Sequence, residues 1–297
     1  RIGVILGTST SGIAAGEAGI EARIRNGVFP SDYSYRQQEI GTIGPFAARL
    51  LGVTGPAYTV STACTSGAKA LIAARNLLSL GLCDAVVSGG VDTLCRLTIG
   101  GFSALESVAA ERCNPMSRNR CGINVGEAAA LFVLSREPAE VCLIGAGEAS
   151  DAYHLSAPDP AGRGAEIAIR AALTESGIDA SAIDYVNLHA TATLKNDAME
   201  SAVMARVFPD GVLASGTKPL TGHTLGAAGA LEAAFCCLAL TGKGQLPPHI
   251  WDAVPDSTLP ALNLVTTGQC LPYGQGRLCM SNSFAFGGSN TSLIFTD

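Results

Sequence analysis

The stretch Val60-Ser-Thr-Ala-Cys64-Thr-Ser-Gly67 leads from an apolar, β-branched segment through a cysteine into a run rich in Ala and Leu. This pattern predicts a buried strand over 56–62 followed by a helix over 64–80. Cys64 would then stand at the helix start, where free N–H groups and the helix dipole favour a thiolate and can hold an oxyanion. A buried cysteine is more often a small apolar residue, so the position alone leaves both interpretations open.

The same alternation of element types continues along the chain. Strand-like segments separated by Ala-rich helical segments predict a layered α/β fold with a parallel sheet. The other predicted strands are 2–7, 84–91, 129–135, 141–147, 183–189, 212–216, 278–283 and 291–296. The other predicted helices are 44–51, 164–176, 197–207 and 225–241. A glycine-rich turn is expected between the last two strands, which should pair with each other.

A strand followed by a small-residue helix occurs twice, once at Cys64 and once at His223-Thr-Leu-Gly-Ala-Ala-Gly-Ala-Leu231. The repetition favours a duplicated fold in which two central helices approach closely between two sheets. Small-residue helices are also common in α/β enzymes in general, so duplication is favoured but not required. The polar stretch Arg136-Glu-Pro-Ala-Glu140 suggests a boundary, which divides the chain into halves 1–138 and 139–297.

Bulk composition excludes several classes of protein. The net charge is −6 and the Lys and Arg residues form no cluster, so the basic surface of a nucleic-acid binder is missing. The ten cysteines are scattered without a Cys-x-x-Cys pair, which favours a reduced, cytoplasmic protein without a structural zinc site. No apolar run is long enough to span a bilayer. The opening Arg1-Ile-Gly-Val-Ile-Leu-Gly7 resembles a strand already under way, so we expect that an N-terminal portion is absent.

Two histidines stand where catalytic residues are expected in an α/β fold. His189 ends the predicted strand 183–189, and His223 stands with Lys218 at the entrance to the predicted helix 225–241. Strand ends are where such folds place their chemistry. Each histidine alone is more often structural than catalytic. Their combination with Cys64 favours an enzyme that uses a cysteine nucleophile.

At four separated motifs, in the same order, the chain resembles the β-ketoacyl-ACP synthase family of the thiolase superfamily. The motifs are Thr62-Ala-Cys64-Thr-Ser-Gly67, His189-Ala-Thr-Ala-Thr193, Gly222-His223-Thr-Leu-Gly-Ala-Ala-Gly229 and Asn282-Ser-Phe-Ala-Phe286-Gly-Gly-Ser-Asn290. A weaker fifth match is Arg120-Cys-Gly-Ile-Asn-Val-Gly-Glu127. The resemblance implies a five-layered α-β-α-β-α fold, usually a dimer.

The resemblance also implies a reaction, the decarboxylative condensation of malonyl-ACP with an acyl group held on Cys64. His189 and His223 would assist the decarboxylation and stabilise the enolate, with a division of labour that the sequence leaves open. The amides of Cys64 and Phe286 would form the oxyanion hole. Thr191 and Thr193 match positions that bind the phosphopantetheine amides.

Further residues take supporting roles by the same resemblance. Lys218 would order the site electrostatically together with Glu200, while Asp197 and Glu127 fit the family pattern around it. The Phe286 ring would act as a mobile gate beside the nucleophile. No metal or cofactor is implied, since the substrates travel on acyl carrier protein. The expected partners are that carrier and a second subunit, in a homodimer or a heterodimer.

Three departures from the family pattern and two rival functions qualify this picture. Alanine replaces the usual glycine at Ala128, Ala190 and Ala285, and an alanine beside Phe286 should stiffen the gate. These changes suggest a specialised branch such as the aryl polyene synthases, although fatty-acid elongation is the default.

A thiolase-like acyltransferase would carry a second cysteine where His223 stands. A non-catalytic chain-length-determining partner would usually lack Cys64.

Overall fold

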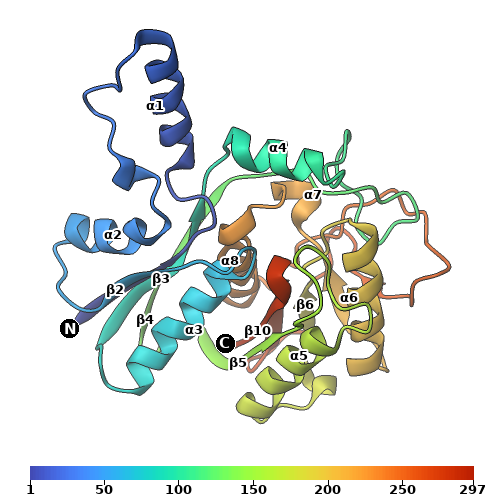
Figure 1. Cartoon of the computed structure of the whole chain (residues 1–297). Helices are drawn as coiled ribbons and strands as arrows, with labels where there is room; N and C mark the ends of the chain where they lie inside the picture. Colours follow the sequence, from blue (N-terminus) through green and yellow to red (C-terminus); the bar gives the residue numbers. More distant parts are fainter.

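The computed structural model describes all 297 residues as two β-sheets with helices around and between them (Figure 1). The first sheet has the order β2-β1-β3-β4 and the second the order β5-β10-β9-β6-β7-β8. The strands of the first sheet are β1 (Ile2–Gly7), β2 (Ala57–Val60), β3 (Ala85–Asp92) and β4 (Ala128–Ser135). Those of the second are β5 (Cys142–Ser150), β6 (Tyr185–Asn187), β7 (Leu213–Ser215), β8 (Asn263–Leu264), β9 (Leu278–Phe284) and β10 (Ser289–Thr296).

Eight α-helices complete three further layers. They are α1 (Ile13–Asn26), α2 (Ile43–Leu51), α3 (Ser66–Ser79), α4 (Arg96–Ala104), α5 (Arg163–Ser176), α6 (Leu194–Val207), α7 (Lys218–Thr221) and α8 (Ala228–Thr241). Helix α2 covers the outer face of the first sheet, α3 and α8 fill the space between the sheets, and α5 and α6 cover the outer face of the second (Figure 1). The predicted five-layered fold is therefore confirmed.

The two sheets repeat one topology. In the first, β1 runs parallel to β2 and β3, and β4 pairs antiparallel with β3. In the second, β6 runs parallel to β7 and β9, and β10 pairs antiparallel with β9. Helix α3 precedes β3 as α8 precedes β9, so the expected duplication is visible in order, direction and connection.

The two central helices touch through their small residues. A Cβ atom placed on Gly67 would lie 2.9 Å from the Cβ of Ala230, and one on Gly229 would lie 2.8 Å from the Cβ of Ala68. Real Cβ atoms do not approach so closely, so only glycine fits at both positions. The Ala and Gly content of both helices thus lets residues 66 and 228 begin their helices side by side, which brings the two helix starts together.

The predicted strands and helices are present within a few residues, with two differences. Both sheets are mixed rather than parallel: β4 pairs antiparallel with β3 in the first, and in the second the short glycine-rich turn between β9 and β10 can only join antiparallel neighbours. Helices α1, α4 and α7 and the short strand β8 were not predicted; α1 buries only glycines, so it lacks the apolar periodicity that marks a helix. The predicted boundary at residues 138 and 139 falls in the segment joining β4 to β5, and the division into two halves stays a prediction. None of the helices is both long and apolar enough to traverse a bilayer.

Candidate active site

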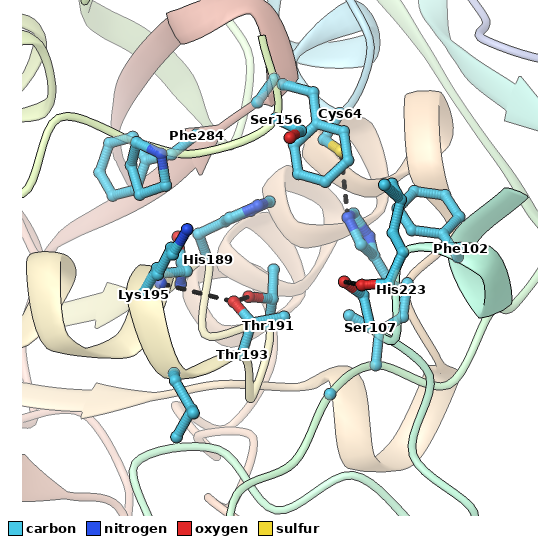
Figure 2. Close-up of a pocket in the computed structure, with 18 of the residues that line it drawn as sticks. Cys64, Phe102, Ser107, Ser156, His189, Thr191, Thr193, Lys195, His223 and Phe284 are labelled. Atoms are coloured by element: carbon cyan, nitrogen blue, oxygen red, sulfur yellow. Dashed lines mark hydrogen bonds between the residues drawn. The ribbon is translucent and has the colours of Figure 1, made fainter. Parts of the chain in front are cut away.

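Three elements bring Cys64, His189 and His223 together in a buried cluster (Figure 2). Cys64 precedes α3, His189 follows β6, and His223 follows α7. The Cys64 Sγ lies 3.1 Å from the His223 Nε2, and the two imidazole rings meet edge to face with centroids 5.3 Å apart. The three residues singled out from the sequence thus form one constellation, although 125 residues separate Cys64 from His189 (189 minus 64).

A cavity of about 470 Å³ opens onto this cluster. Its walls include all three residues, together with Thr191, Thr193 and Phe286 from the predicted site. Phe102 and Ser107, which the sequence did not single out, lie beside His223 in Figure 2. The cavity gives an extended substrate access to an otherwise buried thiol.

A tight turn fixes Cys64 in place. Ala63 has a left-handed φ of 53°, and the Ser66 hydroxyl accepts from the Thr62 N–H at 2.9 Å while donating to the Ala63 carbonyl at 2.6 Å. Such strained strand-to-helix turns are known for presenting a nucleophile. The turn explains why the sulfur faces the cavity rather than the core between the sheets.

The protonation state of Cys64 differs from the expectation drawn from the helix start. Burial raises the pKa of the Cys64 thiol to about 12, which outweighs the lowering by the positive charge of Lys218. The resting residue is therefore a neutral thiol, and a neighbouring base has to remove its proton. His223 is the group in position to do so, because its Nε2 is the atom facing the sulfur.

Both histidines are neutral in this environment. Burial lowers the pKa of His189 and of His223 well below the ordinary value, and the charge of Lys218 lowers both further. The Lys218 Nζ lies 3.4 Å from the His189 Nδ1. An ammonium group can only donate, so the His189 Nδ1 accepts and the proton of this imidazole resides on Nε2.

Lys218 pairs with a different acid from the one expected. Its Nζ lies 2.5 Å from an oxygen of Glu232 and donates to the His189 carbonyl, whereas Glu200 makes no contact with it. Lys218 and Glu200 still interact electrostatically, because the charge of Lys218 lowers the pKa of Glu200, so their joint role in ordering the site stays a prediction. Glu232 was missed, although a single acid in the apolar run 225–241 was a usable signal, since such residues are buried only with a partner.

Glu200 and Asp197 instead hold the backbone that follows His189. Glu200 accepts from the N–H groups of His189 and Ala190, both at 2.7 Å, and Asp197 accepts from the Ala192 N–H at 3.1 Å. Burial raises the pKa of Glu200 to about 7 and that of Asp197 to about 6. These carboxyl groups stabilise a segment in which Ala190 and Ala192 both have positive φ, 39° and 61°.

The remaining predicted residues divide between the cavity and the surface. The hydroxyls of Thr191 and Thr193 lie 2.9 Å apart on the cavity wall, and Thr193 also caps α6. Glu127 does not reach the cavity; it is exposed and accepts from the Leu94 N–H at 3.0 Å. The N–H groups of Cys64 and Phe286 donate to no other residue, so both are free to bind a substrate oxygen.

In the gate segment, residues 285–288, the residues with left-handed backbone conformations are glycines. Ala285 has φ −127° and ψ 157°, an extended conformation that any residue adopts, while Gly287 and Gly288 have φ near 80°. Ala285 is therefore unstrained in this conformation, and the expectation that it stiffens the gate stays a prediction. The Gly287 N–H donates to the Leu155 carbonyl at 2.8 Å, and the Phe286 ring lies 5.7 Å from that of Phe102.

Asp92 is another residue that the sequence did not single out. It is buried at the end of β3 and accepts from the N–H groups of Ser9 at 2.9 Å, Thr10 at 2.9 Å and Gly226 at 2.6 Å. These bonds tie the end of β1 to the turn that follows His223. An acid directly after a buried strand was the signal for it.

One group of residues could hold a metal ion. The ligand atoms of Cys64, His189 and His223 lie within 4.8 Å of one another, but the Lys218 ammonium beside His189 would repel a cation bound there. The expectation that no metal or cofactor is needed stays a prediction.

Comparison with known proteins places these residues in a wider context. The family models for the N-terminal and C-terminal domains of beta-ketoacyl synthase match residues 1–139 and 141–251. Nodulation protein E of Rhizobium meliloti is 35% identical over 82% of this chain, which spans 63% of that relative. The 3-oxoacyl-[acyl-carrier-protein] synthase 2 of Vibrio cholerae is 31% identical, with 99% of this chain and 75% of the relative covered.

Solved structures agree with these relatives. The ketosynthase ApeO of Xenorhabdus doucetiae, solved in complex with its chain length factor ApeC, superimposes with a TM-score of 0.94 and 48% identity. The match covers all of this chain and 74% of that one. The ishigamide ketosynthase/chain length factor gives a TM-score of 0.89 at 29% identity, covering all of this chain and 75% of that one.

Proposed function

This chain belongs to the β-ketoacyl synthase family, and from that premise we propose that it catalyses a decarboxylative Claisen condensation of malonyl-ACP with an acyl group carried on Cys64. The product would be a 3-oxoacyl-ACP. One observation supports this above all others: a buried thiol lies 3.1 Å from a neutral imidazole, with a second imidazole beside it, on one substrate-sized cavity.

In the first half-reaction Cys64 accepts the acyl group. Its sulfur attacks the thioester carbonyl carbon of the acyl carrier, and its proton moves to the His223 Nε2. The N–H groups of Cys64 and Phe286 stabilise the oxyanion. The bond from carbon to the carrier sulfur then breaks, and the carrier thiolate leaves with the proton that His223 received.

In the second half-reaction a malonyl carrier takes the place of the first. Its carbon–carbon bond to the carboxylate breaks, carbon dioxide leaves, and the electron pair forms an enolate. The His189 Nε2–H, whose position follows from the contact of Nδ1 with Lys218, donates to the enolate oxygen. The enolate carbon attacks the acyl carbonyl and expels the Cys64 thiolate, which regains a proton from solvent through His223.

Substrates would reach this site on the phosphopantetheine arm of acyl carrier protein. Thr191 and Thr193 present hydroxyls on the cavity wall at the start of α6, in a position to bind the amides of such an arm. Related solved structures include a ketosynthase captured with its acyl carrier protein. That likeness and the threonine positions support the carrier as a partner.

The second expected partner is another synthase-like subunit, in a homodimer or a heterodimer. Helix α1 projects from the body of the molecule in Figure 1, and Ile20, Ile24 and Leu97 expose apolar side chains along the groove between α1 and α4. Because the 48% identical ApeO pairs with a chain length factor, a chain-length-factor-like subunit suits this face. A polyketide or aryl polyene pathway follows most naturally from that pairing, with fatty-acid elongation as the other candidate.

A cytoplasmic location completes the proposal. All ten cysteines are free thiols, including the exposed Cys121, Cys142 and Cys270. Free thiols are typical of reducing compartments. The acyl carriers on which the reaction depends must be present in the same compartment.

The decisive experiment is intact-protein mass spectrometry after incubation with a panel of acyl carrier thioesters. We expect an acyl adduct on the natural chain and none on Cys64→Ala, because no other thiol meets both a base and free N–H donors. An adduct that persists in Cys64→Ala would contradict the assignment. Absence of any adduct and of labelling by a thiol-directed condensing-enzyme inhibitor would favour the alternative of a non-catalytic chain-length-determining partner. An adduct that forms without any decarboxylation of malonyl carrier would instead favour a thiolase-like acyltransferase.

A further inference from the structure

His249 is a buried titratable residue that the proposed reaction does not use. It lies after α8, only 5% exposed, with both ring nitrogens hydrogen-bonded. The Gly216 N–H donates to its Nδ1 at 3.0 Å, and its Nε2 lies 3.0 Å from the Pro115 carbonyl. A carbonyl only accepts and a backbone N–H only donates, so these two bonds require the tautomer protonated on Nε2.

One of these bonds leads toward Lys218. Gly216 directly follows the strand β7, and after it come Thr217 and then Lys218, the first residue of α7. Lys218 in turn contacts the His189 Nδ1 and carbonyl. The Gly216 N–H is therefore held by His249 two residues before the ammonium that orients His189.

The other bond leads toward His223. Pro115 lies in the loop between α4 and β4, in which the Met116 N–H donates to Asp197 at 2.8 Å. Further along the same loop, the Asn124 carbonyl accepts from the His223 N–H at 2.6 Å. His249 thus joins the turn that carries Lys218 to the loop that holds the backbone of His223.

The backbone at Gly216 is packed against Ala190 as well as against His249. A Cβ atom at Gly216 would lie 2.4 Å from the Cβ of Ala190 and 3.7 Å from the Cε1 of His249. Ala190 directly follows His189. The turn before Lys218 is consequently packed between the imidazole of His249 and the residue next to His189, with no room to shift.

We propose that His249 is a positioning residue that sets the distance between the Lys218 ammonium and the His189 imidazole by bridging Gly216 and Pro115. The proposal rests on the proposed condensation. It assigns His249 to the decarboxylation step, which needs the His189 Nε2–H, rather than to the acylation of Cys64, which depends on His223 and on the N–H donors beside the sulfur.

The test uses three variants measured in both half-reactions. His249→Ala removes both bonds, His249→Asn retains an acceptor near the Nδ1 position for Gly216, and His249→Gln retains a donor near the Nε2 position for Pro115. We expect His249→Ala to slow decarboxylation of malonyl carrier by about 10- to 100-fold while single-turnover acylation changes by less than about threefold. His249→Asn should recover most of the decarboxylation rate, since the Gly216 bond is the one that leads to Lys218.

Two controls separate positioning from general destabilisation. Ile169→Ala, in the fully buried core of α5, lowers the melting temperature without touching the cavity, and should slow both half-reactions equally or not at all. Long-range ¹H–¹⁵N spectra of the histidine side chains in the natural chain should show His249 protonated on Nε2. A proton on Nδ1, equal loss of both half-reactions in His249→Ala, or no loss in either would overturn the proposal. Failure of the natural chain itself to acylate or decarboxylate would instead overturn the proposed function.

Discussion

At the scale of single residues, burial controls the thiol of Cys64. Burial destabilises the Cys64 thiolate by more than the nearby positive charge of Lys218 stabilises it, so the pKa of the thiol rises to about 12. A raised pKa means less thiolate at any given pH. Activation therefore requires the proton to leave for His223 in the same step in which sulfur attacks carbon.

This protonation state predicts the pH dependence of alkylation. Between about pH 6 and about pH 10 the rate of iodoacetamide reaction at Cys64 should be nearly independent of pH, because the thiol and its base His223 both stay neutral throughout; in His223→Ala it should instead rise about tenfold per pH unit with the small thiolate fraction. Peptide-resolved mass spectrometry gives the rate, with the exposed Cys270 of the same sample as the internal reference. A tenfold rise per pH unit in the natural chain would show that free thiolate reacts without a base and contradict the role given to His223.

A second residue-scale prediction concerns the pair Ala190 and Gly216. Gly216→Ala should destabilise the protein by about 1–3 kcal/mol, because its new Cβ would lie 2.4 Å from that of Ala190. Ala190→Gly should change stability by less than about 1 kcal/mol, since relief of its φ of 39° is offset by greater freedom of the unfolded chain.

The double variant tests whether the two residues are coupled. We expect Ala190→Gly to rescue part of the cost of Gly216→Ala, with a coupling energy of about 1–2 kcal/mol in denaturant unfolding. Strict additivity of the two changes would show that the methyl group at 190 is not what requires glycine at 216. The pair explains how a non-glycine residue is accommodated directly after His189.

At the scale of secondary-structure elements, the contact between α3 and α8 sets the position of the nucleophile. The starts of both helices adjoin the site, since Cys64 precedes α3 and His223 stands shortly before α8. Any change in helix separation would therefore alter the distance from sulfur to imidazole as well as the packing of the core. Gly67 and Gly229 keep that separation small.

Gly229→Ala should thus cost both stability and activity. Its methyl group would meet the Ala68 Cβ at 2.8 Å and the Ser283 hydroxyl at 2.9 Å, which predicts a loss of about 1–3 kcal/mol in unfolding free energy and slower acylation. The matched control is Gly100→Ala in α4, where no atom lies within 4 Å of the new Cβ. That change should stabilise the protein by about 0.5–1 kcal/mol. Equal effects at both positions would refute close packing as the cause.

At the scale of the whole molecule, most of the fold could be predicted from local patterns in the sequence. Alternating apolar strands and small-residue helices predicted a layered α/β fold and its duplication. The resemblance to the β-ketoacyl-ACP synthases implied the five layers, and its motifs predicted that Cys64, His189 and His223 would meet. The ion pair between Lys218 and Glu232 was not predicted, because only Glu200 was considered, although Glu232 is the one acid in the apolar run 225–241. Helix α1 escaped prediction because its exposed apolar side chains and buried glycines reverse the usual pattern.

The two central helices also pack into one hydrophobic core to which both halves of the chain contribute. The core around Leu71 and Ile72 of α3 is completed by Tyr185, Ala233 and Leu240 of the second half. The first sheet and Cys64 are synthesised well before residues 228–241. The apolar face of α3 that packs against α8 is therefore exposed to solvent while the second half is still being translated. The nucleophile therefore gains its base, its cavity and its shelter from solvent in a single late docking event. A chain in which the second half has not yet docked would expose the apolar face of α3 and would lack the base beside Cys64. It would therefore be prone to aggregation, without activity, and dependent on chaperones.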